Sequence, residues 1–128
     1  MNSLEYQKLV QRTKSEMRIH VGKHNEDLLH ATMGAATEAG ELLDAVKKHL
    51  FYGKPLDMIN LQEEVGDILW YLAVLCEWSG TTLEEQMEHN INKLRIRYPE
   101  KFDANKALNR DVVAELQAYG NDPVQNKA

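Results

Sequence analysis

The sequence predicts an all-α protein, because apolar residues recur at helical spacing along most of the chain. The residues that end helices are sparse and lie between these periodic segments. The 128 residues, 43% of them apolar, are enough for one domain with a buried core. We therefore expect a bundle of four to five helices, which further assembles into an oligomer.

Capping and turn residues give approximate bounds for each expected helix. The expected helices span about residues 3–19, 25–51, 57–78 and 81–97, followed by a shorter one over about 109–119. Gly53 and Pro55 predict a turn between the second and third helices. Residues 1–102 are expected to form the helical domain and 103–128 a C-terminal extension, whose last eight residues contain little to pack and are expected to be disordered.

The third expected helix is apolar on all sides between Ile68 and Cys76. One packing face does not require this, so the helix should be central in the monomer or shared with a second subunit, and we expect a homo-oligomer, a dimer or a tetramer. The nine apolar residues are too few for a membrane span, which needs roughly 20. The single cysteine, Cys76, and the lack of a signal-peptide pattern favour a cytoplasmic location.

The net charge of the chain argues against polyanionic partners. Twenty acidic and 15 basic residues give a formal charge of −5. A negative surface repels nucleic acid polymers and anionic membranes, so neither is expected as a partner.

Two pairs of acids carry the chemical information in this sequence. Glu38 and Glu41 lie in the second expected helix and Glu64 and Asp67 in the third, and each pair is spaced i, i+3. This spacing places both members on one helix face. The midpoint between the two pairs falls at the turn, Tyr52-Gly53, so antiparallel helices would bring all four carboxylates to one level.

Four carboxylates at one level repel one another unless a cation is present. An all-oxygen ligand set suits Mg²⁺ or Mn²⁺ rather than zinc. Such sites commonly recruit the phosphates of a substrate, so a nucleotide or a similar phosphate ester is the expected ligand. The alternative is that these acids belong to ordinary solvated helix faces.

The segments TEAGELLDAVKK and EEVGDILWYLAVL resemble the ExxE…ExxD signature of the MazG-like nucleotide pyrophosphohydrolases. Both contain the acid-x-Gly-acid form of that family, as EAGE and EVGD, and the later HNINKLRIRYPEKF resembles its basic fourth helix. The resemblance covers about residues 25–102. It implies an all-α oligomer that hydrolyses the α–β phosphate bond of nucleoside triphosphates.

The resemblance also implies roles for individual residues. Glu38, Glu41, Glu64 and Asp67 would be the Mg²⁺ ligands, and one of these acids or its bound water would help to activate the attacking water. Lys93 and Arg97 would hold phosphates, and Asn90 shares their helix face. Many relatives have a further acid where this chain has Thr37, so an additional metal ligand is not expected.

Aromatic and histidine residues near the acids are further candidates for substrate binding. Tyr71, one turn after Asp67, could contact a base or a ribose, although a buried aromatic is the ordinary explanation. His30, and less so His24, could line a nucleoside pocket, although isolated histidines are more often structural. Trp70 is expected in the core or in a subunit interface.

Two other functions are consistent with the same sequence. A phosphoribosyl-ATP pyrophosphohydrolase has the same four acids but a different substrate. A non-catalytic helical binding module would present the acids only as a negative surface. The sequence contains neither a GxGxxG nor a GxxxxGK[ST] phosphate loop, which excludes dinucleotide oxidoreductases and P-loop NTPases.

Overall fold

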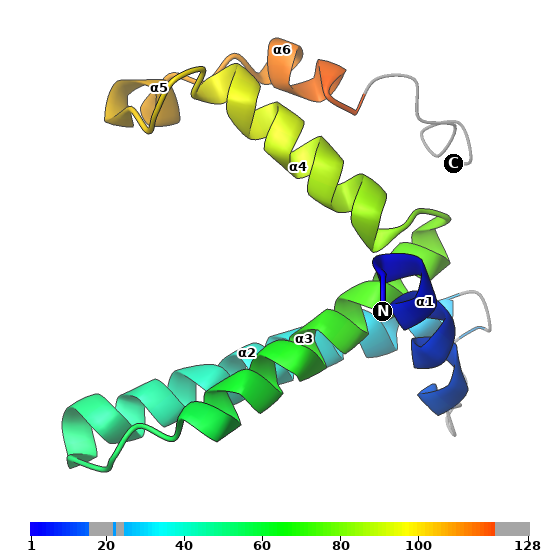
Figure 1. Ribbon diagram of the computed structural model, residues 1–128, viewed down its shortest axis with the longest axis vertical. Coiled ribbons are helices and arrows are strands. Elements are labelled where there is room, and N and C mark those ends of the chain that lie inside the picture. The colour runs from blue at the N-terminus through cyan, green and yellow to red at the C-terminus, as the bar shows by residue number, and fades with distance from the viewer. Residues whose placement is uncertain (16–21, 23–24, 120–128) are drawn as a thin grey trace.

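The computed structural model describes residues 1–15, 22 and 25–119. This part of the chain contains helices and no strand, which confirms the predicted all-α class. Two long antiparallel helices form a hairpin, a third long helix leaves it at an angle, and short helices lie at both ends of the chain (Figure 1). The described elements are α1 (Ser3–Val10), η1 (Gln11–Thr13), α2 (Glu26–Tyr52), α3 (Met58–Ser79), α4 (Leu83–Arg97), α5 (Ala104–Leu108) and α6 (Val112–Gln117).

The ends of the long helices are set by local sequence, close to where it predicts them. Gly53, with φ 67°, adopts the left-handed conformation that ends α2, a conformation that glycine adopts without steric cost. The Asp57 side chain accepts hydrogen bonds from the Ile59 and Asn60 amides and so begins α3. At the other end, Gly80 has φ 72°, and Thr82 forms a capping box with Glu85 at the start of α4.

Two of the predicted elements are wrong in extent. The first helix ends at Val10 and continues only as the 3-10 turn η1, because Thr13 donates its hydroxyl proton to the Val10 carbonyl (3.1 Å) and Lys14 is extended. The helix expected over 109–119 is instead the short α6, and a further short helix, α5, precedes it. The residues expected to be disordered, 121–128, lie outside the described part of the chain.

The core lies where α1 packs on the open end of the hairpin. It consists of Val10, Ala31, Ala73 and Val74, all at most 3% exposed. Gln7 is buried beside it and ties α1 to the loop between α3 and α4: its Nε2 donates to the Thr81 carbonyl and its Oε1 accepts from the Leu83 amide. These contacts fix the open end, while the acids lie further along the hairpin.

The far end of α4 is held by α6 rather than by the hairpin (Figure 1). Glu115 of α6 is 3% exposed and accepts two hydrogen bonds from Arg97 of α4, from Nε at 2.7 Å and from Nη2 at 2.6 Å. Arg110 donates to the same carboxylate from its Nη2 at 2.6 Å. A buried glutamate paired with two arginines therefore fastens the extension to α4.

The apolar surface of the hairpin is only partly covered in this single chain. Leu69 and Leu72, which lie in the segment expected to be buried on all sides, are 43% and 37% exposed, whereas Ala73, Val74 and Cys76 are buried. Other large side chains exposed on α2 and α3 are Leu43, Leu50, Phe51, Ile59 and Val65. None of the described helices combines the length and the apolar character needed to cross a membrane.

Candidate metal centre

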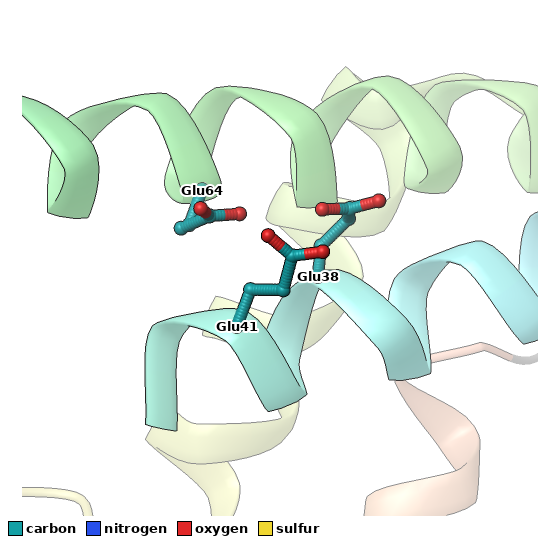
Figure 2. A group of neighbouring side chains, drawn as sticks. All are labelled: Glu38, Glu41 and Glu64. Carbon is teal, nitrogen blue, oxygen red and sulfur yellow. The ribbon is translucent and has the colours of Figure 1, made fainter. Parts of the chain in front are cut away.

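Three carboxylates meet between the two helices of the hairpin. Glu38 and Glu41 extend from α2 and Glu64 from α3, and all three point into the space between the ribbons (Figure 2). One oxygen from each lies within 4.8 Å of the other two. The local reason is the register of the hairpin: the turn at Gly53 places residues 41 and 64 at the same level, and the i, i+3 spacing adds Glu38 on the same face of α2.

Asp67, the fourth predicted acid, lies next to this group rather than inside it. It is exposed and lines the same cavity as Glu38, where its charge helps to raise the Glu38 pKa. The structure thus brings together three of the four predicted acids and places the fourth one helical turn further along α3.

Glu64 is the most buried member of the group, with 4% of its surface exposed. Its Oε1 accepts a hydrogen bond from Asn60 Nδ2 at 2.8 Å, but its Oε2 is buried with no hydrogen-bond partner. A buried carboxylate oxygen without a donor is costly, and other carboxylates nearby increase that cost. A cation bound at this position would supply the missing partner.

The electrostatics of the neighbouring carboxylate agree with this conclusion. The Glu38 pKa is raised above its usual value, first by burial and then by the charges of Glu41 and Asp67 and by contact with Glu64. Among the described residues, no lysine or arginine forms a salt bridge with any of these acids. Within the described part of the chain, the negative charge of this group is therefore not paired with a cationic side chain.

The residues fit a hard divalent cation. Magnesium and manganese ions bind carboxylate oxygens, and the donor set here is entirely oxygen, with one buried oxygen unsatisfied. Glu38, Glu41 and Glu64 are the residues that could hold such an ion.

A cavity of about 460 Å³ adjoins the acids on the side of the open end of the hairpin. It contains the acids Glu38 and Asp67 and three rings, His30, Trp70 and Tyr71, in edge-to-face contact with centroids 4.9–5.9 Å apart. Thr13 and Ser15 complete its lining. The structure therefore places both predicted aromatic candidates, His30 and Tyr71, beside the acids.

Gly34 determines where the Tyr71 ring lies. The ring packs directly on the α2 backbone at Gly34, and a Cβ at this position would overlap it. Burial, followed by the charges of Glu38 and Asp67, raises the Tyr71 pKa above its usual value, so the phenol stays protonated and can donate a hydrogen bond.

Sequence reasoning missed two features of this cavity. Trp70, expected in the core or in a subunit interface, packs against the core cluster and in addition lines the cavity, where its Nε1 donates to the Thr13 hydroxyl at 2.8 Å. Thr13 and Ser15 precede the hairpin and carry no motif. Their place depends on how α1 and η1 pack against α3, which no local signal predicts.

The predicted phosphate-binding residues do not join the acids. Asn90, Lys93 and Arg97 lie on α4, which runs away from the hairpin (Figure 1). The Arg97 guanidinium forms a salt bridge with Glu115, so in this conformation Arg97 has a structural role. His24, the weaker histidine candidate, lies outside the described residues.

The comparisons with known proteins place this acid-bearing helical hairpin in a family. Residues 26–102 match the model of the MazG nucleotide pyrophosphohydrolase domain, and the chain therefore belongs to this family, which confirms the resemblance seen in the sequence. A curated relative, the "Gene 37 protein" of Mycobacterium phage L5, is 37% identical over 79 residues, covering 56% of this chain and 67% of that protein. No solved structure matches the chain.

Membership in the MazG family indicates, at the level of the family, what reaction the chain catalyses. The activity of the family is nucleotide pyrophosphohydrolysis, which is typically dependent on a divalent metal ion, and the three clustered carboxylates lie within the matched region. The extension that carries α5 and α6 lies beyond residue 102 and outside the match.

Proposed function

We propose that this chain hydrolyses nucleoside triphosphates, including deoxynucleotides, to the nucleoside monophosphate and pyrophosphate, with Mg²⁺ as the preferred ion and Mn²⁺ as a substitute. The observation that carries this proposal is the buried, unpartnered oxygen of Glu64 within a group of three carboxylates. Such a group suits a divalent ion and, through it, the phosphates of a nucleotide.

Glu38, Glu41 and Glu64 would hold the ion. When bound, Mg²⁺ neutralises phosphate charge and lowers the pKa of a coordinated water. Asn60 fixes the orientation of Glu64 through its 2.8 Å hydrogen bond and so presents the unpartnered Oε2 to the site.

In this proposal, Asp67 acts on the attacking water. It lies beside Glu38, exposed on the wall of the aromatic cavity, and as a carboxylate it can accept a proton. Water adds to a phosphorus of the α–β anhydride, the bond from that phosphorus to the bridging oxygen breaks, and the proton released by the water passes to Asp67. The bridging oxygen keeps the electron pair of the broken bond.

The aromatic cavity suits the nucleoside. Its volume of about 460 Å³ lies in the range of small-ligand sites, and its rings offer both a stacking surface and polar edges. In this arrangement His30 and Tyr71 contact the base or the sugar. A phosphate-binding role for Asn90 and Lys93 remains a prediction.

A homo-oligomer is part of the proposal. The hairpin exposes large apolar side chains on both helices, Leu43, Leu50 and Phe51 on α2 and Ile59 and Val65 on α3. Exposed apolar surface of this kind indicates a protein interface. A second copy of the chain would bury it, and sedimentation of the purified protein would show a dimer or a tetramer.

The experiment is product analysis by chromatography after incubation with a panel of ribonucleoside and deoxyribonucleoside triphosphates, with Mg²⁺ or with a chelator. We expect monophosphate and pyrophosphate to appear in equal amounts only with the metal. Release of inorganic phosphate as the first product, or turnover that survives chelation, would contradict the proposal. If no triphosphate is cleaved, phosphoribosyl-ATP is the next substrate, and binding without turnover of any nucleotide would indicate a binding module.

A further inference from the structure

A second cavity lies on the other side of the carboxylate group, toward the hairpin turn. It measures about 470 Å³ and shares Glu41 and Glu64 with the candidate metal centre. It has no aromatic residue and instead contains two lysines. Its lining is Glu41, Asp44, Ala45, Lys48, Lys54, Pro55, Asp57, Asn60 and Glu64.

The end of α2 places the two lysines together. The Lys48 carbonyl accepts hydrogen bonds from the amides of Gly53 and Lys54, the latter at 3.3 Å, and His49 Nδ1 lies 2.8 Å from the Lys54 carbonyl. These contacts close the chain into a tight turn that brings Lys54 back beside the last turn of the helix. The turn thus holds the backbones of Lys48 and Lys54 close together, and both residues line the cavity.

The acids of this cavity are already engaged by other groups. Asp57 caps α3 through two backbone amides, and Asp44 pairs with Lys48 at 2.5 Å and with Lys47 at 3.5 Å. Glu41 and Glu64 belong to the candidate metal centre. Lys54 forms no salt bridge with any described residue, so within this part of the chain its charge is available to an anion in the cavity.

Lys48 and Glu41 lie on the same face of α2. They are seven residues apart, so they share a helix face and are separated by about 10 Å along the axis. The Lys48–Asp44 pair is about half exposed, and exposed pairs of this kind are weak, so an incoming anion can displace it at little cost. A phosphate chain that starts at the carboxylate group can therefore extend toward Lys48, and Lys54 lines the same cavity.

We propose that Lys48 and Lys54 form a subsite for the terminal phosphates of the substrate, the part that leaves as pyrophosphate. This inference rests on the proposed function and gives it a direction: the nucleoside lies in the aromatic cavity, the α–β bond lies at the carboxylates, and the β- and γ-phosphates point toward the hairpin turn. Arg97, one of the two residues that the family resemblance predicts to hold phosphates, is held by Glu115, and these two lysines take that role for the terminal phosphates.

The test is titration calorimetry of the full chain with inorganic pyrophosphate in the presence of Mg²⁺, on the wild type and on Lys48→Ala and Lys54→Ala. Each variant should bind pyrophosphate about tenfold more weakly, since each loses one charge-assisted contact. The matched control is Lys47→Ala, which removes the same charge from the same helix but lies outside the cavity and should bind within about twofold of the wild type. Thermal unfolding checks that all variants are folded.

The outcomes separate this subsite from the proposed function. If the wild type cleaves triphosphates but Lys48→Ala and Lys54→Ala alter neither pyrophosphate affinity nor KM, the subsite is wrong and the function stands. If the wild type cleaves no triphosphate yet binds pyrophosphate in a way that depends on these two lysines, the subsite stands without the function. An equal loss of pyrophosphate affinity in Lys47→Ala overturns the assignment, because Lys47 does not line this cavity.

Discussion

Glu64 and Glu115 are two glutamates with nearly the same burial, 4% and 3% exposed, in two regions of the molecule. Glu115 lies where α4 meets α6, and Arg97 and Arg110 surround its carboxylate. Glu64 lies between α2 and α3 among other carboxylates, and one of its oxygens has no partner. Among the described residues, two arginines form salt bridges with Glu115 and no cationic side chain forms one with Glu64.

This difference indicates a structural role for the Glu115 charge and a functional role for the Glu64 charge. A buried charge that is fully paired holds two elements together, as Glu115 holds the extension on α4. A buried charge left unpaired lowers the stability of the fold and persists where a ligand completes it. The comparison therefore predicts that substitutions at the two glutamates affect different properties.

The largest effect is expected for Glu64→Gln. The amide keeps the shape and the contact with Asn60 but removes one negative charge from the candidate metal centre, so we expect turnover to fall by about 100-fold or more. The fold should be no less stable, since one repulsive charge is lost. Steady-state kinetics and thermal unfolding measure the two properties on the same sample.

The matched control is Glu63→Gln, which changes the neighbouring residue on the same helix. Glu63 is exposed and does not line either cavity beside the carboxylates, so its substitution should leave turnover within about twofold. Full activity in Glu64→Gln would remove Glu64 from the site.

The second effect is stabilisation by the metal. Binding to the folded state alone stabilises by about 2.7 kcal/mol at a concentration one hundred times Kd, so Mg²⁺ should raise the unfolding midpoint of the wild type by several degrees. Glu64→Gln should lose most of this shift, whereas Glu115→Gln should retain it. Differential scanning fluorimetry with Mg²⁺ and with chelator provides the measurement, and an equal shift in both variants would break the distinction between the two glutamates.

The third effect is structural. Glu115→Gln leaves Arg97 and Arg110 without their carboxylate, so we expect the unfolding midpoint to fall by several degrees while turnover per folded molecule changes little. Circular dichroism follows the unfolding, and Glu88→Gln on the exposed surface of α4 serves as the control. If turnover falls by as much as in Glu64→Gln, then Arg97 takes part in the reaction after all.

The fourth effect concerns the aromatic cavity, where the Tyr71 ring packs on Gly34. Gly34→Ala displaces the Tyr71 ring, so KM for the nucleotide should rise severalfold. Gly40→Ala is the control on the same helix, because a Cβ there meets no atom within 4 Å, and it should stabilise the helix by about 1 kcal/mol. An unchanged KM in Gly34→Ala would place the nucleoside elsewhere.

The sequence predicts the hairpin well because its determinants are local. Gly53 and Asp57 each fix a helix end through their own neighbours, and the spacing of the acids then follows from the helix period. The position of Thr13 at the cavity and the Glu115 network depend on contacts between distant residues, Trp70 with Thr13 and Arg97 with Glu115. Neither pair has a sequence signature. The sequence alone therefore predicts a phosphate-binding role for Arg97, and only the structure shows that Glu115 is its partner.

The smallest effect is expected from acid, and it concerns Glu115 alone. Arg97 and Arg110 hold the Glu115 pKa at about 2, below the usual value of 4.5. A lowered pKa in the folded state means that Glu115 stabilises the fold fully above about pH 4.5 and loses this contribution as the pH falls toward 2. The difference in unfolding midpoint between the wild type and Glu115→Gln should therefore be constant from pH 7 to about 5 and shrink below that. A difference that persists unchanged at pH 2.5 would show that the carboxylate charge is not what holds α6 on α4.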